Sequence, residues 1–87
     1  MYEWDAANLR KLADHGIMKE EAIEAIEGLT VELPTQMSEG AYRYKLIGET
    51  TTGKVLVVLW TEGRQPDTIR IFNAYKAEPR EVRIYRK

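Results

Sequence analysis

The run VLVVLW at residues 55–60 is the feature that most constrains the fold of this chain. In a pleated strand its apolar side chains point to both faces, so that strand has to be covered on both sides. The run is far shorter than the ~20 apolar residues of a membrane-spanning helix, and no signal segment is evident. We therefore expect a central strand inside a soluble, cytoplasmic protein.

Further strands are predicted on both sides of this run. Residues 42–48 alternate between Tyr42, Tyr44 and Leu46 on one face and Arg43, Lys45 and Ile47 on the other. A turn at 50–53 leads from them into residues 55–61, which predicts a hairpin. Residues 30–33 predict a short strand that Pro34 ends, followed by a loop over residues 35–40. Residues 68–75 predict a last strand, with Ile69, Ile71, Asn73 and Tyr75 on one face and Arg70, Phe72 and Ala74 on the other.

Helices are predicted at both ends of the chain. From residue 6 the apolar residues recur at helical spacing, with Asp5 placed to cap the start and Gly16 to end the helix after His15. A second helix is predicted over 19–27, ended by Gly28, and a third over 79–86, beginning at Pro79.

This order of elements predicts an α+β fold. Two N-terminal helices pack on a small antiparallel sheet of three to four strands, and a helix follows at the C-terminus. At 87 residues the chain should form one domain over residues 1–87. If the first two helices cover one face of the sheet, the other face needs the C-terminal helix, a second copy of the chain or a different protein.

Composition removes several classes of enzyme. The chain has no cysteine and one histidine, which excludes disulfides, thiol nucleophiles and zinc sites of known spacing. It lacks the glycine-rich phosphate-binding motifs and a serine-hydrolase elbow. We therefore expect no cofactor and no bound metal.

Charge is unevenly distributed although the net charge is only −1. Residues 20–32 contain five glutamates and no basic residue, whereas residues 64–87 contain seven basic and three acidic residues. A sequence pI of about 5.8 does not favour general nucleic-acid binding. The basic end of the chain is either an ordinary solvated surface or a surface that binds phosphate.

One reaction needs neither a metal nor a protein nucleophile. RNA can be cleaved by its own 2′-hydroxyl when a protein positions the backbone, moves protons and neutralises the phosphate. Each candidate residue also has a purely structural explanation, such as a solvated strand arginine or a helix-end histidine. The predicted catalytic residues are Arg64, Tyr75, Lys76, Arg80 and His15, and the predicted RNA-binding residues are Arg43 and Arg70.

An ordered set of motifs resembles the BrnT-like toxin family. The motifs are EWDxxN at 3–8, HGIxxEEA at 15–22, RYxxxGxTxxGxxLxVxxT at 43–61, IRI at 69–71 and AxKA at 74–77. The resemblance implies a RelE-like ribonuclease fold and the toxin half of a type II toxin-antitoxin pair. It also implies a small antitoxin, which we expect to cover the open face of the sheet. At the position of Tyr75 the family usually has an arginine.

Two functions remain open at this point. The first is a metal-independent endoribonuclease toxin that cleaves RNA through its 2′-hydroxyl. The alternative is a catalytically weakened or inactive RelE-like domain that binds a protein or RNA. Salt-dependent RNA binding without cleavage would favour the second.

Overall fold

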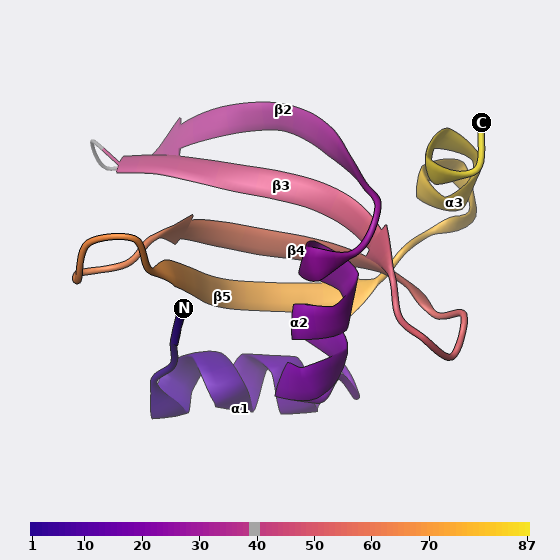
Figure 1. The fold of residues 1–87 in the computed structure, drawn as a ribbon. Coiled ribbons are helices and arrows are strands. Elements are labelled where there is room, and N and C mark those ends of the chain that lie inside the picture. The colour runs from indigo at the N-terminus through magenta and orange to yellow at the C-terminus, as the bar shows by residue number, and fades with distance from the viewer. Residues whose placement is uncertain (39–40) are drawn as a thin grey trace.

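The apolar run at 55–60 lies in the central strand of a five-stranded sheet, as predicted (Figure 1). The computed structural model describes residues 1–38 and 41–87, and the side chains outside residues 35–42. Val55, Leu56, Val57 and Val58 are all buried, because elements cover both faces of this strand. The elements, in chain order, are β1 (Tyr2–Glu3), α1 (Ala6–Asp14), α2 (Lys19–Glu27), β2 (Thr30–Ser38), β3 (Ala41–Glu49), β4 (Val55–Glu62), β5 (Ile69–Lys76) and α3 (Pro79–Tyr85).

The α+β class is confirmed, but the sheet is larger and of a different type than predicted. Its order is β1-β5-β4-β3-β2, and β1 runs parallel to β5, so the sheet is mixed. The prediction of three to four antiparallel strands missed β1, which pairs Tyr2 with Ile69 and Glu3 with Arg70. Two residues are too few for any periodic pattern, so this pairing leaves no local signal.

The helices cover the two faces of the sheet unequally. α1 and α2 pack on one face, around a core that includes Leu12, Ala22 and Ala25. α3 packs on the opposite face, around Ile47 and Val57. Figure 1 shows α3 at one end of the sheet, close to the C-terminus. Among the residues that the structure describes, the C-terminal helix therefore covers only one end of the second face.

The predicted helix boundaries are confirmed for the first two helices. The Asp5 side chain accepts a 2.8 Å hydrogen bond from the backbone N–H of Asn8, and His15 is the C-cap of α1. Gly16 has a φ of +73°, the left-handed conformation that ends a helix at little steric cost. α2 spans the predicted residues and Gly28 is its C-cap. α3 begins at Pro79 as predicted and ends one residue earlier, at Tyr85.

The predicted end of the second strand at Pro34 is wrong. β2 continues through Pro34 to Ser38, with a shift of register between Leu33 and Gln36. β2 is an edge strand, and proline is tolerated in edge strands and bulges because its missing N–H removes no ladder hydrogen bond there. Residues 35–38 of the predicted loop thus belong to the strand, while residues 39–40 lie outside the described residues.

The prediction of which sheet face each β5 residue points to is also wrong after Phe72. Leu59 pairs with Asn73 while the next residue, Trp60, pairs with Ile71, so Phe72 is an extra residue in a bulge. Ile71 packs with the cluster under α1 and α2, but Tyr75 packs with the cluster under α3. The bulge therefore moves Tyr75 to the face that is partly open.

Candidate functional site

Tyr75 is the centre of a polar cluster on the face covered by α3. Its hydroxyl lies 3.4 Å from Oε2 of Glu81, which is a buried residue of α3. The other oxygen of Glu81 accepts a 2.8 Å hydrogen bond from the backbone N–H of Glu78, closing the capping box of α3. Lys45 of β3 places its Nζ 3.9 Å from the same Oε2. A phenol, a carboxylate and an ammonium group thus meet at one point of the sheet.

His15 reaches this cluster from the end of α1. Its ring centroid lies 6.4 Å from that of Tyr75, with an angle of 56° between the rings. The backbone of His15 is fixed because its N–H donates to the carbonyls of the last helical turn. The helix-end role predicted for His15 and a position beside Tyr75 are therefore compatible.

Arg80 lies next to the same cluster from the first turn of α3. It lines a pocket of about 270 Å³ together with Lys45 and Glu81. A second pocket of about 600 Å³ follows along α3 and is lined by Arg80, Arg83, Ile84, Arg86 and Lys87. The basic character predicted for the end of the chain is thus concentrated on α3.

Arg43 and Arg70 lie in a different pocket of about 410 Å³, between α1 and strands β3 to β5. The guanidinium of Arg43 lies over the ring of Phe72, 4.8 Å from the ring centroid. Arg70 forms an ion pair with Asp5. The backbone N–H of Asn8 and the Arg70 guanidinium together hold the pKa of the Asp5 carboxyl below its usual range. The charge of Arg70 is therefore already engaged, whereas Arg43 is exposed.

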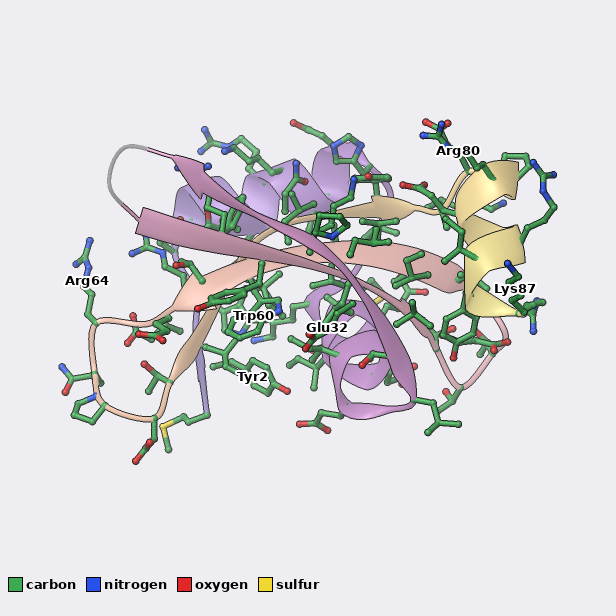
Figure 2. All side chains as sticks on the ribbon, turned by 90° about the horizontal axis from the view of Figure 1, so that it is seen from above. Tyr2, Glu32, Trp60, Arg64, Arg80 and Lys87 are labelled. Carbon is green, nitrogen blue, oxygen red and sulfur yellow. The ribbon has the colours of Figure 1, made fainter. Side chains whose placement is uncertain are left out.

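Arg64 and Lys76 do not join the cluster around Tyr75. Arg64 is exposed in the loop between β4 and β5, at the opposite end of the molecule from Arg80 (Figure 2). Lys76 pairs with Leu56, which belongs to the core under α1 and α2. Because Lys76 follows Tyr75 directly in a strand, the two side chains point to opposite faces of the sheet. Five predicted catalytic residues are thus distributed over three parts of the surface.

Sequence reasoning missed Glu81, Lys45 and Phe72 as members of these sites. A signal existed for Glu81, because Glu-Pro-x-Glu at 78–81 is typical of a capped helix start. Lys45 lies two residues from Arg43 and shares its strand face. No local pattern reveals that Phe72 lies under Arg43, since that contact depends on the bulge in β5.

The loop that carries Arg64 is held by Glu3 of β1. Oε2 of Glu3 accepts hydrogen bonds from the backbone N–H of Gln65 at 2.8 Å and from the hydroxyl of Thr68 at 2.6 Å. These bonds lower the pKa of Glu3 from 4.5 to about 2, with the backbone of Gln65 the largest cause. The carboxylate therefore ties the first strand to this loop in its charged form.

We expect the hydrogen bonds of Glu3 to the loop to make the stability of the fold depend on pH in the acid range. A carboxyl whose folded-state pKa is lowered stabilises the fold fully above the unfolded value of 4.5, and this contribution disappears as the pH falls towards 2. Glu3→Gln should thus lower the melting temperature at pH 7 and have little effect near pH 2. Glu32→Gln is the control, because Glu32 is exposed in β2, and it should leave the melting temperature unchanged. An equal effect of Glu3→Gln at both pH values would contradict this assignment.

A family model decides the identity of the chain. The model described as "Ribonuclease toxin, BrnT, of type II toxin-antitoxin system" matches residues 4–81. The chain belongs to the BrnT family. This agrees with the resemblance found in the sequence, and the match covers every element of the BrnT fold except β1 and the end of α3.

Family membership also defines the biological setting. A type II toxin has a protein antitoxin as its partner, so membership of this family of ribonuclease toxins implies an antitoxin for this chain. A comparison with curated proteins finds no match. Within residues 1–38 and 41–87, no helix is long and apolar enough to cross a membrane. In the same residues, no three His, Cys, Asp or Glu side chains are grouped so as to hold a metal ion.

Proposed function

We propose that this BrnT protein is a metal-independent endoribonuclease with a RelE-like mechanism, in which the 2′-hydroxyl of RNA attacks the adjacent phosphate. The observation that carries the proposal is the position of Tyr75, whose ring lies 6.4 Å from that of His15 and whose hydroxyl lies 3.4 Å from Oε2 of Glu81. Two groups that can move protons beside a phosphate are what this reaction requires. Lys45 and Arg80 add positive charge next to the same cluster.

The roles follow from the chemistry of each group. Tyr75 takes the proton of the 2′-hydroxyl as its own phenolic proton passes to a neighbouring acceptor, so that the phenol stays neutral. His15 in its protonated form donates a proton to the leaving 5′-oxygen. Arg80 and Lys45 stabilise the negative charge that builds up on the phosphate in the transition state. Of these, Arg80 can bind two phosphate oxygens at once through its guanidinium.

The remaining predicted residues are assigned to RNA binding away from the cleaved bond. Arg43 with Phe72 offers an aromatic ring and a guanidinium plane, both of which stack on unpaired bases. Arg64 adds positive charge in the loop between β4 and β5, and Arg70 lies in the pocket of Arg43 with its charge paired to Asp5. Lys76 lies on the opposite face of the sheet, so any contact of Lys76 with RNA is made there. Arg64 lies too far from Arg80 in the molecule to share one phosphate with it (Figure 2).

The mechanism is tested with an RNA that carries one 2′-deoxynucleotide immediately before the mapped cleavage position. We expect the purified protein to cleave the all-ribose RNA, to leave a 2′,3′-cyclic phosphate and to spare the deoxy-substituted RNA. Cleavage should continue in EDTA. Cleavage of the deoxy-substituted RNA, or activity that EDTA abolishes and Mg²⁺ restores, would contradict the proposal.

The alternative function is a binding module without catalysis. It is favoured by the tyrosine at position 75, where the resemblance to the family implies an arginine. In that case the protein binds single-stranded RNA with a salt-dependent affinity and leaves it intact. Measuring binding and cleavage on the same RNA separates the two functions.

We further propose that the antitoxin covers the open part of the sheet face that carries Tyr75 and Arg43. α3 shields only one end of this face. A protein bound to the rest of the face would block the pocket lined by Arg80 and the pocket lined by Arg43. Amide hydrogen exchange of β3 and β5 should then slow in the complex. Protection confined to α1 and α2 would place the antitoxin on the other face.

A further inference from the structure

We propose that Glu81 is a positioning residue for Tyr75 and accepts the phenolic proton as Tyr75 takes the proton of the 2′-hydroxyl. The inference rests on the proposed ribonuclease function and deepens it. It gives the buried carboxylate of Glu81 a role in the reaction in addition to its role in capping α3.

The two oxygens of Glu81 have separate contacts. Oε1 accepts the backbone N–H of Glu78 at 2.8 Å and so completes the cap of α3. Oε2 faces the hydroxyl of Tyr75 at 3.4 Å and lies 3.9 Å from Nζ of Lys45. Glu81 is only 8% exposed, so water has little access to this oxygen. The cap thus uses one oxygen and leaves the other directed at the phenol.

A second capping box in the same chain shows what a purely structural glutamate looks like here. Glu21 of α2 also occupies the third helical position and accepts the N–H of Met18 at 3.0 Å. Its other oxygen is bound by Nζ of Lys54 at 2.6 Å. In α3 the corresponding lysine, Lys45, stays 3.9 Å away. Oε2 of Glu81 is therefore less neutralised by Lys45 than Oε2 of Glu21 is by Lys54. It remains available to Tyr75.

The proton balance of the step is complete with these groups. The 2′-oxygen forms a bond to phosphorus, and the bond between phosphorus and the 5′-oxygen breaks. The 2′-hydroxyl proton passes to the phenolic oxygen of Tyr75, whose own proton passes to Oε2 of Glu81. The 5′-oxygen receives its proton from protonated His15. Tyr75 thus remains a neutral phenol throughout, and the proton that leaves the sugar resides on Glu81.

The test is Glu81→Gln, which keeps the size of the side chain and its capping ability but removes the charge. We expect kcat for RNA cleavage to fall by about 100-fold or more, the scale of a lost general base. The melting temperature should stay close to the wild-type value, because glutamine can keep the capping hydrogen bond to the backbone N–H of Glu78. Glu21→Gln is the matched control, with the same cap and a lysine partner, and should keep the wild-type rate.

Three outcomes separate this inference from the proposed function. If Glu81→Gln retains the wild-type kcat, Glu81 has only its capping role and the inference is wrong. If Glu81→Gln loses activity and Tyr75→Phe/Glu81→Gln loses no more than either single variant, the two residues act as one unit and the inference holds. If Tyr75→Phe itself cleaves RNA like wild type, the proposed role of Tyr75 fails, and the inference fails with it.

Discussion

Replacing Gly48 with alanine is expected to destabilise the protein by about 3 kcal/mol or more. Gly48 lies in β3, where α2 packs directly against the strand. A Cβ at this position would lie 2.1 Å from the carbonyl oxygen of Ala25 and 2.8 Å from its carbonyl carbon. Both atoms belong to the backbone of a helix, so neither can move aside without displacing α2 from the sheet.

Two other glycines provide matched controls for this prediction. A Cβ at Gly28 would lie 3.5 Å from the nearest atom, an ordinary contact, so Gly28→Ala should change stability little. Gly16 has open space around it but a φ of +73°, and Gly16→Ala should cost about 1 kcal/mol through backbone strain alone. Chemical denaturation gives the free energy of unfolding of each of the three variants and so ranks these effects. A Gly48→Ala variant no less stable than Gly28→Ala would show that α2 does not pack on β3 as closely as described.

Replacing Tyr75 with phenylalanine is expected to reduce RNA cleavage by about 100-fold to 10,000-fold. The substitution removes the hydroxyl that faces Glu81 and leaves the ring, which packs against the core cluster of Ile47, Val55, Val57 and Ala77. Since the ring fills the same space, the melting temperature should change by only a few degrees. The loss would then concern the reaction and not the fold.

Tyr44→Phe is the control for this variant. Tyr44 stacks on Trp60 with 4.4 Å between ring centroids, and it shares the sheet face of Leu46, opposite that of Tyr75. We expect it to retain the wild-type rate of cleavage. Equal losses in both tyrosine variants would indicate a general effect on the sheet, and full activity of Tyr75→Phe would remove the phenol from the mechanism.

Part of the candidate site could be read from the sequence, but the grouping of its residues could not. Tyr75, His15 and Arg80 are predicted from the sequence; in the structure His15 lies beside Tyr75, the hydroxyl of Tyr75 faces Glu81, and Arg80 shares a pocket with Glu81 and Lys45. Chemistry that suits RNA cleavage limits the candidates to phenol, imidazole, guanidinium and ammonium groups. Which of them meet depends on contacts between α1, β5 and α3, and no spacing along the chain encodes those contacts.

The sequence by itself determined the elements whose signals are local. The cap at Asp5, the end of α1 at Gly16 and the boundaries of α2 each depend on residues within one or two helical turns. The central position of β4 follows from the apolar run, because burial on both faces is visible in the composition of the strand.

Tertiary structure alone decided the register and the faces. One extra residue, Phe72, shifts the pairing of β5 on β4 and moves Tyr75 to the face opposite Ile71. Since side chains in a strand alternate with a period of two, a shift of one residue exchanges the two faces completely. Such a shift is fixed by the neighbouring strand and by the helices that pack on it, because β5's own residues fit either alternation.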